Sequence, residues 1–600
     1  MKHTLRLLAL VLLLVIPNIS AQEGHIKLLA IGEGGGNFTG SVADLYLTIQ
    51  PGSGRVFIET FPLTKIDTQI STRFAQEIAC KYLDKDCDVY DFFYTIQSPA
   101  AIVGGPSAGA AIATLTVAAL EGIQLNDSVA MTGTINSGAL IGPVGSIKEK
   151  IYAAKQAGLS RVLVPTEQMS YEEHNKTINI ADLAARWNIQ VTGVESLDDS
   201  LAAFSGKNHT RQAKPIIVDE RYVKTMQGLG RTLCDRAKLF SRQIRESPTG
   251  KERITEQFVK SNKDAEKLLE KGLNALSNNT PYSAASFCFG ASVALHSQLL
   301  YLKNLSGEQL AAAAFNISKN INAVDNHIEQ RERKTITDLQ AYMIIKERLL
   351  DARGALDEGT NSSAQLAYAS ERLESAISWQ RFFGVGDGRV ALDEKSLRKS
   401  CLDKLSEVGE RYQYISLFFP DILTDIHKSI IDAYDYYGRG DYELCLFKAI
   451  QTKAETDVLS GLIGVKQEAI DALLTKKLAA AEREIAKQID DGVFPILAYS
   501  YYEYANTLST DQKTSALIYA EYALEMSDLD IYFRQSKEKT PYDRIAAFVA
   551  KYSNFVLVVF GALVGALVYG IVSFRSRKSE KYTLHHLPHR KKRKKIRVRN

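Results

Sequence analysis

The sequence predicts an α+β domain, then an all-α helical-repeat region and one C-terminal transmembrane helix. Strand-like runs alternate with helical patterns up to about residue 205. From about residue 218 to 530, Ala, Leu, Lys, Glu and Tyr recur at helical spacing. The twenty residues 555–574, which begin with Phe555 and end with Phe574, contain no charge and are long enough to cross a bilayer.

Five segments follow from these patterns. They are a signal peptide at 1–21, the α+β domain at 24–205, the helical-repeat region at 206–552, the transmembrane helix at 554–574 and a basic tail at 575–600. The N-terminus is positively charged, then briefly apolar, and ends in a small residue at Ala21, as in secretory signals. An uncleaved anchor is the alternative.

The basic tail predicts the orientation in the membrane. Residues 575–600 contain twelve Lys and Arg against one acidic residue, whereas the whole chain carries only +4. Positive residues beside a membrane span stay in the cytoplasm, so residues 22–552 are expected outside it, in a single-pass cell-membrane protein. The tail would fix this topology and contact anionic lipid; binding to nucleic acid is the alternative.

Within the α+β domain, the order of elements predicts a mixed sheet with helices. The strand-like runs are residues 25–31, 43–49 and 55–60, and the helical patterns are residues 72–83 and 148–157. The glycine-rich GEGGG at 32–36 lacks the strand-to-helix setting of a dinucleotide site and predicts a loop.

Ser107 lies in a tight turn, GGPSAG, and the small and apolar residues 108–120 predict a buried helix after it. A serine at a helix start commonly caps backbone N–H groups, which is one interpretation. The glycines Gly104, Gly105 and Gly109 favour another, because they let a substrate backbone approach the hydroxyl. The helix start would also direct N–H groups at an oxyanion formed there. Ser107 is therefore a candidate nucleophile.

A serine nucleophile needs a base to take its proton, and Lys150 is the candidate. Ile147 and Ile151 recur at helical spacing and define a buried face that includes Lys150, whereas Lys148 projects toward solvent. Burial disfavours the charged ammonium and lowers the pKa, so a neutral amine becomes able to act as base. The alternative is a lysine whose stem packs on the core while its head reaches water.

This stretch resembles the proteolytic domain of Lon-type (S16) serine proteases, whose Ser-Lys dyad combines a PSAG turn with a lysine on a later helix. Four blocks occur in the family's order. They are GGPSAG at 104–109, AMTGTI at 130–135, GPVGSIKEKIYAAKQAG at 142–158 and VLVP at 162–165.

The resemblance implies that Ser107 is the nucleophile and Lys150 the general base. It also implies that Thr132 hydrogen-bonds the lysine amine, and that backbone N–H groups near Gly105 and Ser107 form the oxyanion hole. Gly104 departs from the pattern, because many Lon proteases have an acidic residue there, so any role of that acid in gating or substrate contact is in doubt for this chain.

A second departure concerns ATP. Lon proteases usually join this domain to an ATPase, yet the sequence contains no G-x-x-x-x-G-K-[ST] phosphate loop. Histidines are scattered without an H-E-x-x-H motif and cysteines lack paired spacing, so neither a metal site nor a cofactor is expected.

The helical region repeats at a period of 80 residues. Similar segments begin at Leu273, Arg353 and Ala433, and a fourth copy begins at Tyr504. Each predicts a helix, a polar turn and a second helix, which resembles tetratricopeptide-type repeats with a longer period. Stacked hairpins would form a concave surface for an extended segment or partner. The alternative is a helical bundle that serves as a spacer.

Six cysteines fall in the part expected outside the cytoplasm, where an even number allows three disulfides. Cys80 and Cys87 are close enough in sequence to pair locally, and free buried thiols are the alternative for the set. The other four are Cys234, Cys288, Cys401 and Cys445.

Together these features predict an ATP-independent, membrane-anchored serine endopeptidase that cleaves unfolded or exposed segments of protein and peptide substrates. The resemblance also implies a homo-oligomer. One alternative is a receptor or scaffold whose repeats bind a partner and whose protease-like domain is inactive. A self-processing enzyme that releases its own ectodomain is another.

Overall fold

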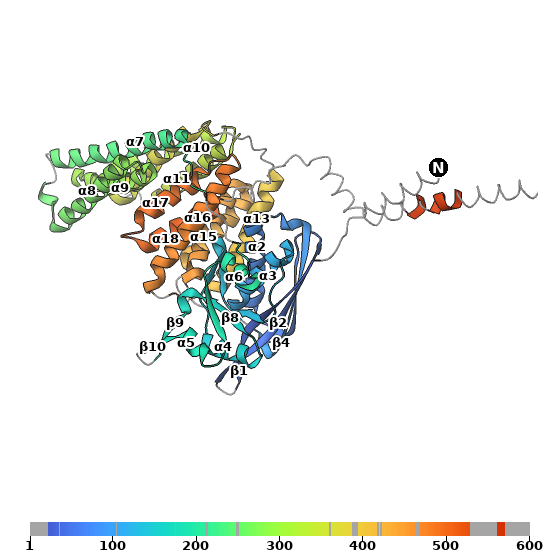
Figure 1. The fold of residues 1–600 in the computed structure, drawn as a ribbon. Helices are drawn as coiled ribbons and strands as arrows, with labels where there is room; N and C mark the ends of the chain where they lie inside the picture. Colours follow the sequence, from blue (N-terminus) through green and yellow to red (C-terminus); the bar gives the residue numbers. More distant parts are fainter. Residues whose placement is uncertain are drawn as a thin grey trace, which may run out of the picture. The chain divides into compact units, whose positions relative to one another are not determined.

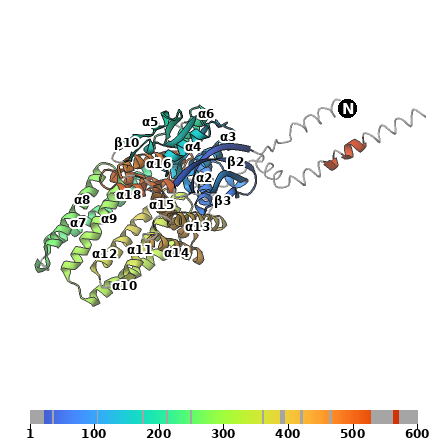
Figure 2. The same ribbon diagram turned by 90° about the horizontal axis from the view of Figure 1, so that it is seen from below.

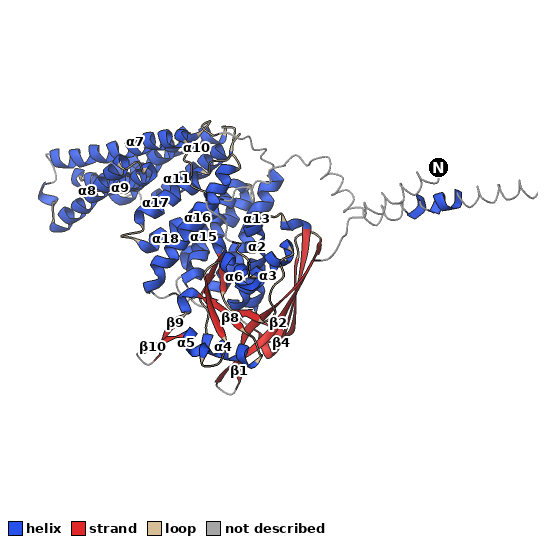
Figure 3. Ribbon diagram, viewed as in Figure 1, coloured by secondary structure: helices blue, strands red, loops and turns tan. Residues whose placement is uncertain are grey.

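The structure, a computed structural model, describes two parts of the chain. One is residues 22–527, apart from 35–36, 104, 174–175, 210–213, 248–250, 359–361, 387–393, 417–418, 420–422, 463–464 and 466; the other is residues 561–570, apart from 564. The chain divides into two compact units, residues 1–535 and 536–600. In the first unit, a region of strands and helices precedes a region of helices (Figures 1 and 3).

A seven-stranded mixed sheet is the centre of the N-terminal region, in the order β11-β8-β5-β1-β2-β4-β3. The long β1 and β2 form an antiparallel hairpin, and β2 also pairs antiparallel with β4. The remaining neighbours in the sheet are parallel. Its strands are β1 (Gln22–Gly34), β2 (Asn37–Pro51), β3 (Val56–Thr64), β4 (Tyr90–Val103), β5 (Val129–Met131), β8 (Arg161–Pro165) and β11 (Gln190–Val194).

Helices cover both faces of this sheet because its strands are apolar on both sides. Leu28 of β1 belongs to a core formed with α2 (Ile66–Leu83), α3 (Gly109–Glu121) and α6 (Leu197–Ser205). Its neighbour Leu29 points to the other face and packs with α4 (Ile147–Gln156) and α5 (Ile180–Ala185). The turn that contains Ser107, the candidate nucleophile, leads into α3, and Lys150, the candidate base, lies on α4. The two candidate residues are therefore carried by helices that cover opposite faces of the sheet.

The predicted strands and helices of this region are confirmed, with one correction. The GEGGG segment was expected to be a loop, but its first three residues, Gly32 to Gly34, continue β1 and pair with β2 down to Gly34 opposite Asn37. The long hairpin extends the pairing past the point where the glycines alone would end a strand. Residues 35–36 lie outside the described residues.

All four predicted hairpins are present in the helical region. The three segments that begin at Leu273, Arg353 and Ala433, and the fourth at Tyr504, each fall on two helices joined by a short connection. The helices are α7 (Glu220–Glu246), α8 (Glu256–Ser277), α9 (Pro281–Lys303), α10 (Gly307–Glu329), α11 (Ile336–Glu358), α12 (Ser363–Trp379), α13 (Glu394–Ser416), α14 (Thr424–Arg439), α15 (Tyr442–Leu462), α16 (Ile470–Asp490), α17 (Ile496–Leu508) and α18 (Lys513–Ser527).

The last hairpin packs against the first. The rings of Tyr282 on α9 and Tyr501 on α17 have centroids 5.9 Å apart, and Glu503 accepts a hydrogen bond from the backbone N–H of Ser283 at 2.9 Å. In a one-dimensional stack each repeat contacts only its neighbours. A contact across more than 200 residues therefore favours a closed bundle, and the concave binding surface stays a prediction.

Three disulfides are present, so the alternative of free thiols is excluded for all six cysteines. The predicted pair Cys80–Cys87 links the end of α2 to the turn before β4. Within the helical region, Cys234–Cys288 links α7 to α9 and Cys401–Cys445 links α13 to α15.

In the described part of the chain, α9 is the one helix long and apolar enough to cross a membrane. More than half of its most apolar window is buried, and it is linked to α7 by a disulfide. Its burial and its disulfide are therefore those of a core helix, although its composition meets the criteria for a membrane span. Of the predicted span at 554–574, residues 561–563 and 565–570 are helical, with Leu563 and Val568 exposed. The rest of the span, the signal peptide and the tail lie outside the described residues.

The α+β and helical regions contact each other along α2, which packs against α13 (Figure 2), and at the short helix Ser137–Ala139, which packs against α16 and α18. Buried charges bridge this junction: Arg411 of α13 contacts Glu77 of α2 at 3.3 Å. A second bridge runs from Lys477 of α16 to the Ser137 hydroxyl at 2.6 Å. The predicted domain boundary at 205/206 falls between α6 and α7 and stays a prediction.

Candidate active site

Ser107 lies in a short 3-10 helix, Pro106–Ala108, between β4 and α3. Gly105 precedes it with φ 98°, a conformation that side chains disfavour, and Pro106 then begins the helical turn. Gly109 is needed for close packing, because a Cβ there would lie 3.1 Å from Ile135. Glycine and proline therefore stand at positions of this turn whose backbone conformations suit them. Gly104 lies outside the described residues.

The helix that follows, α3, is buried from Gly109 to Leu120, which confirms the predicted buried helix. Its N-cap residue, Ala108, has no polar side chain that could accept hydrogen bonds from the first N–H groups of the helix. The Ser107 side chain is not its cap, so the capping interpretation of Ser107 is not supported for α3. The first two N–H groups of α3, those of Gly109 and Ala110, donate to the carbonyls of Pro106 and Gly133. The positive end of the helix dipole is therefore what favours negative charge at this end of α3.

Lys150 is buried on α4, with 3% of its surface exposed. The buried side of the predicted face is confirmed, because Ile147 and Ile151 are buried beside it. Lys148, which was expected to project toward solvent, is half-buried. Its amine donates a hydrogen bond to the Thr132 hydroxyl at 3.1 Å. The lysine head therefore does not reach water, and burial lowers the pKa of Lys150 to about 8.

Thr132 links the lysine to the serine turn. Its hydroxyl accepts from Lys150 and donates to the Ser107 carbonyl oxygen at 3.3 Å. The same carbonyl accepts from the backbone N–H of Gly133 at 3.0 Å. The structure thus brings Ser107, Thr132 and Lys150 together, although α3 and α4 cover opposite faces of the sheet.

A cavity of about 320 Å³ opens beside Ser107. Its lining includes the apolar side chains of Ile70, Phe74, Ile135 and Val144. Pockets of this size that combine an apolar lining with a few polar groups are typical ligand sites. The arrangement therefore offers a candidate nucleophile with a largely apolar cavity beside it, and a candidate base of depressed pKa that Thr132 links to the same turn.

Two features of this cavity were not predicted from the sequence. Gln168 holds its rim in place, because its side-chain amide exchanges two hydrogen bonds of 2.7 Å with the backbone of Val144. The helical region also contributes to the lining through Arg411, Tyr414 and Ser460. These residues are about 300 positions from Ser107, and no local pattern links such distant positions.

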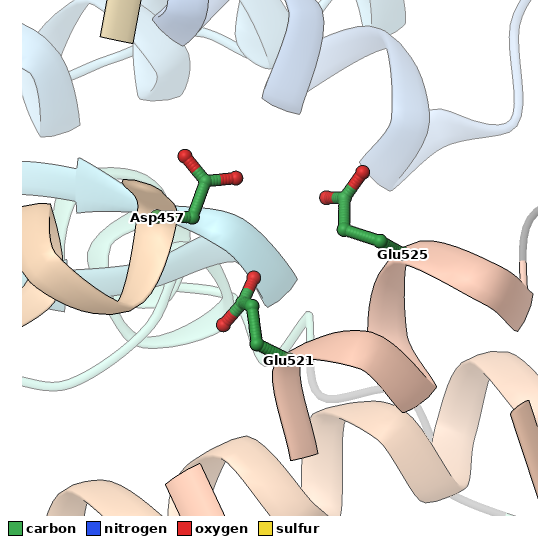
Figure 4. A group of neighbouring side chains, drawn as sticks. All are labelled: Asp457, Glu521 and Glu525. Atoms are coloured by element: carbon green, nitrogen blue, oxygen red, sulfur yellow. The ribbon is translucent and has the colours of Figure 1, made fainter. Parts of the chain in front are cut away.

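Three buried carboxylates of the helical region, Asp457, Glu521 and Glu525, point toward one another (Figure 4). Their oxygens lie within 4.8 Å of each other, which is the geometry of a candidate metal site. Cations already pair with all three: Lys453 contacts Asp457 and Glu525, and Lys477 contacts Glu521. We therefore assign this cluster to the ion network at the junction.

Comparison with known proteins shows what the N-terminal region is similar to. Residues 67–203 match the family model of the Lon protease (S16) C-terminal proteolytic domain. The nucleophile turn, Thr132 and the α4 lysine all fall inside this match. The N-terminal region is therefore similar to the proteolytic domain of Lon proteases.

Individual relatives agree with this family. The archaeal Lon protease of Archaeoglobus fulgidus is 34% identical over 149 residues, which are 25% of this chain and 24% of that protein. Lon protease 1 of Syntrophobacter fumaroxidans is 32% identical over 188 residues, 30% of this chain and 22% of the relative. The peroxisomal Lon protease homolog 2 of Bos taurus is 36% identical over 118 residues, 20% and 13% of the two chains.

The match spans less than a quarter of the length of these relatives. The family match itself also ends at residue 203, before the first helix of the helical region. The similarity therefore identifies the proteolytic domain and does not extend to the helical region.

Proposed function

We propose that this chain is a membrane-anchored, ATP-independent serine endopeptidase in which Ser107 is the nucleophile and Lys150 the general base. The observation that carries the proposal is the hydrogen-bonded connection from the buried Lys150 amine through Thr132 to the backbone of Ser107. A lysine serves as base only when its amine is neutral. With a pKa of about 8, roughly a tenth of the Lys150 side chains are neutral at pH 7.

The reaction follows from these roles. Neutral Lys150 takes the proton of the Ser107 hydroxyl as the serine oxygen attacks the peptide carbonyl, and the resulting ammonium then protonates the leaving amine. Backbone N–H groups near Gly105 and Ser107 stabilise the oxyanion. A water molecule, deprotonated by the same amine, hydrolyses the acyl-enzyme and frees Ser107.

Thr132 positions the lysine in this scheme. Its hydroxyl donates to the Ser107 carbonyl and so presents a lone pair to the Lys150 amine, which fixes the amine near the nucleophile turn. A neutral hydroxyl orients the amine without stabilising its charged form as a carboxylate would. This choice of partner supports a lysine that remains a competent base.

The environment and substrate follow from the rest of the chain. The sequence contains no phosphate loop, so we expect cleavage without ATP of segments that are already unfolded or exposed. The three disulfides are typical of an oxidising compartment and support an extracytoplasmic location of the peptidase. The uncharged residues 555–574 would anchor it, with the basic tail in the cytoplasm. Self-association is a prediction from the family.

Hydrolysis of a fluorescently labelled unfolded protein, measured without ATP, tests this proposal. We expect the full-length wild type to cleave it, and Ser107→Ala and Lys150→Ala to lose the activity. Lys155→Ala is the matched control, because Lys155 is an exposed lysine on the same helix. Equal activity of the wild type and Ser107→Ala, or no cleavage by the wild type of several unfolded proteins, would contradict the proposal.

A further inference from the structure

The cavity beside Ser107 is closed on one side by the helical region. Arg411 and Tyr414 of α13 and Ser460 of α15 line it together with residues of the proteolytic domain. Arg411 and Tyr414 are three residues apart on one helix, and so are Asp457 and Ser460 on the other. Residues at this spacing share a helix face, so each helix turns one face toward the cavity and its supporting ion pairs.

Arg411 fixes α13 in this position. Its guanidinium contacts Glu77 of α2 at 3.3 Å and Asp457 of α15 at 3.1 Å, and it lies 3.5 Å from the ring centroid of Phe74. Phe74 itself lines the cavity. One buried side chain therefore joins the proteolytic domain to both helices that complete the cavity.

The same contacts determine the character of the cavity. Two carboxylates already neutralise Arg411, so its charge offers little attraction to an acidic substrate side chain. Tyr414 adds an aromatic surface to the apolar lining. The Ser460 hydroxyl is buried without a hydrogen-bond partner in the described part of the chain, so it adds one unsatisfied polar group to this largely apolar wall.

We propose that Tyr414 and Ser460 of the helical region are specificity-determining residues of the peptidase, which select a large apolar side chain beside the scissile bond. This inference rests on the proposed function of Ser107. It gives the helical region a direct role in substrate choice at the catalytic site, separate from any binding of partners to its outer surface.

Peptide kinetics with the full-length protein in detergent test the proposal. The substrates are otherwise identical labelled peptides that carry Phe, Leu, Ala or Asp beside the cleaved bond. We expect Tyr414→Ala to reduce the kcat/KM ratio of the Phe to the Ala peptide by roughly tenfold, the scale of discrimination in apolar pockets. Ser460→Leu, which fills the cavity, should lower kcat/KM for the Phe peptide and spare the Ala peptide.

Tyr412→Ala is the matched control, because Tyr412 is on the same helix but contacts His427, with ring centroids 5.6 Å apart, and is not part of the lining. It should leave the ratio unchanged. Active wild type with the same Phe to Ala ratio in Tyr414→Ala and Ser460→Leu would overturn the inference and leave the proposed function intact. Wild type that cleaves none of the peptides and no unfolded protein would overturn both.

Discussion

Two buried lysines show how local partners decide the chemistry of the same residue. Burial alone would lower the pKa of Lys453, but Asp457 at 3.0 Å and Glu525 at 2.7 Å outweigh it and raise the pKa of Lys453 well above its usual value. Lys150 has the Thr132 hydroxyl instead, so burial dominates and its pKa falls to about 8. Only the second environment produces a base near neutral pH.

The depressed pKa predicts the pH dependence of activity. Since the neutral amine is the reactive form, kcat/KM should rise about tenfold per pH unit below pH 8 and level off above it. The measurement is kcat/KM for one peptide between pH 6 and 9.5. A profile that is flat, or that falls over this interval, would argue against Lys150 as the base.

The same pKa predicts an effect on stability. Below pH 8, Lys150 is charged in the core of the folded chain. Between pH 8 and its usual pKa of 10.5, Lys150 is charged only in the unfolded chain. The cost of burying the charge is therefore complete below pH 8 and disappears as the pH rises to 10.5. We expect Lys150→Met to raise the free energy of unfolding by about 1–3 kcal/mol at pH 7.

Thermal unfolding at pH 7 and pH 9.5 checks this. The gain of Lys150→Met should shrink at the higher pH, while Lys155→Met on the exposed face should change little at either. A loss of stability in Lys150→Met at pH 7 would mean that its ammonium is well solvated or paired in the folded protein.

At the scale of elements, a group of charged side chains with little exposure to solvent lies at the junction between α2 and the helices α13, α15 and α18. Burial would raise the pKa of Glu77, but Lys453 and Arg411 outweigh it and lower that pKa to about 2. Glu77 therefore remains ionised, and its charge is balanced by residues of the helical region. Arg411 and Lys453 also pair with Asp457 inside the helical region, so Glu77 is the member of this group whose cations come from across the junction.

Removal of a central cation should therefore destabilise the junction. Lys453→Met removes the shared cation of two buried carboxylates, Asp457 and Glu525, although Arg411 still pairs with Asp457, and we expect a loss of about 3 kcal/mol. Lys513→Met removes an exposed pair with Asp471 and should cost less than about 1 kcal/mol. Hydrogen exchange of α2 and α15 measures both effects. Equal, small effects of the two variants would mean that the network does not hold the junction.

The elements also show which parts of the site the sequence could predict. The burial of α3 and the inward direction of Lys150 could be predicted from local spacing. Helical periodicity shows which residues share the buried face of a helix, even when the element that packs on that face is not known. Arg411 and Tyr414 carry no such signal. Their position depends on how α13 packs on α2, which is a contact between segments more than 300 residues apart.

For the whole molecule, composition alone does not separate a membrane span from a core helix. α9 meets the length and apolarity of a span, yet it packs inside the helical region. We expect the anchor at residues 555–574 instead, since no charge interrupts them and basic residues follow directly. The hairpins were correctly predicted, but the sequence left open whether they form an open stack or a bundle, because that depends on long-range contacts such as those between α9 and α17.

Fractionation of cells tests the anchor. A chain that ends at residue 552 should leave the membrane fraction and retain peptidase activity, whereas the full-length chain should resist extraction with salt and alkali. Retention of the shortened chain in the membrane after alkali would place the anchor elsewhere, with the N-terminal apolar segment as the first candidate.

The most direct test of the central claim is to map covalent labelling by a serine-reactive fluorophosphonate with peptide mass spectrometry. The account predicts one labelled residue, Ser107, with a rate that rises with pH toward 8 and labelling that is lost in Lys150→Ala but retained in Lys155→Ala. Absence of labelling at Ser107 in the wild type, or Ser107 labelling that is unchanged by Lys150→Ala, would contradict it.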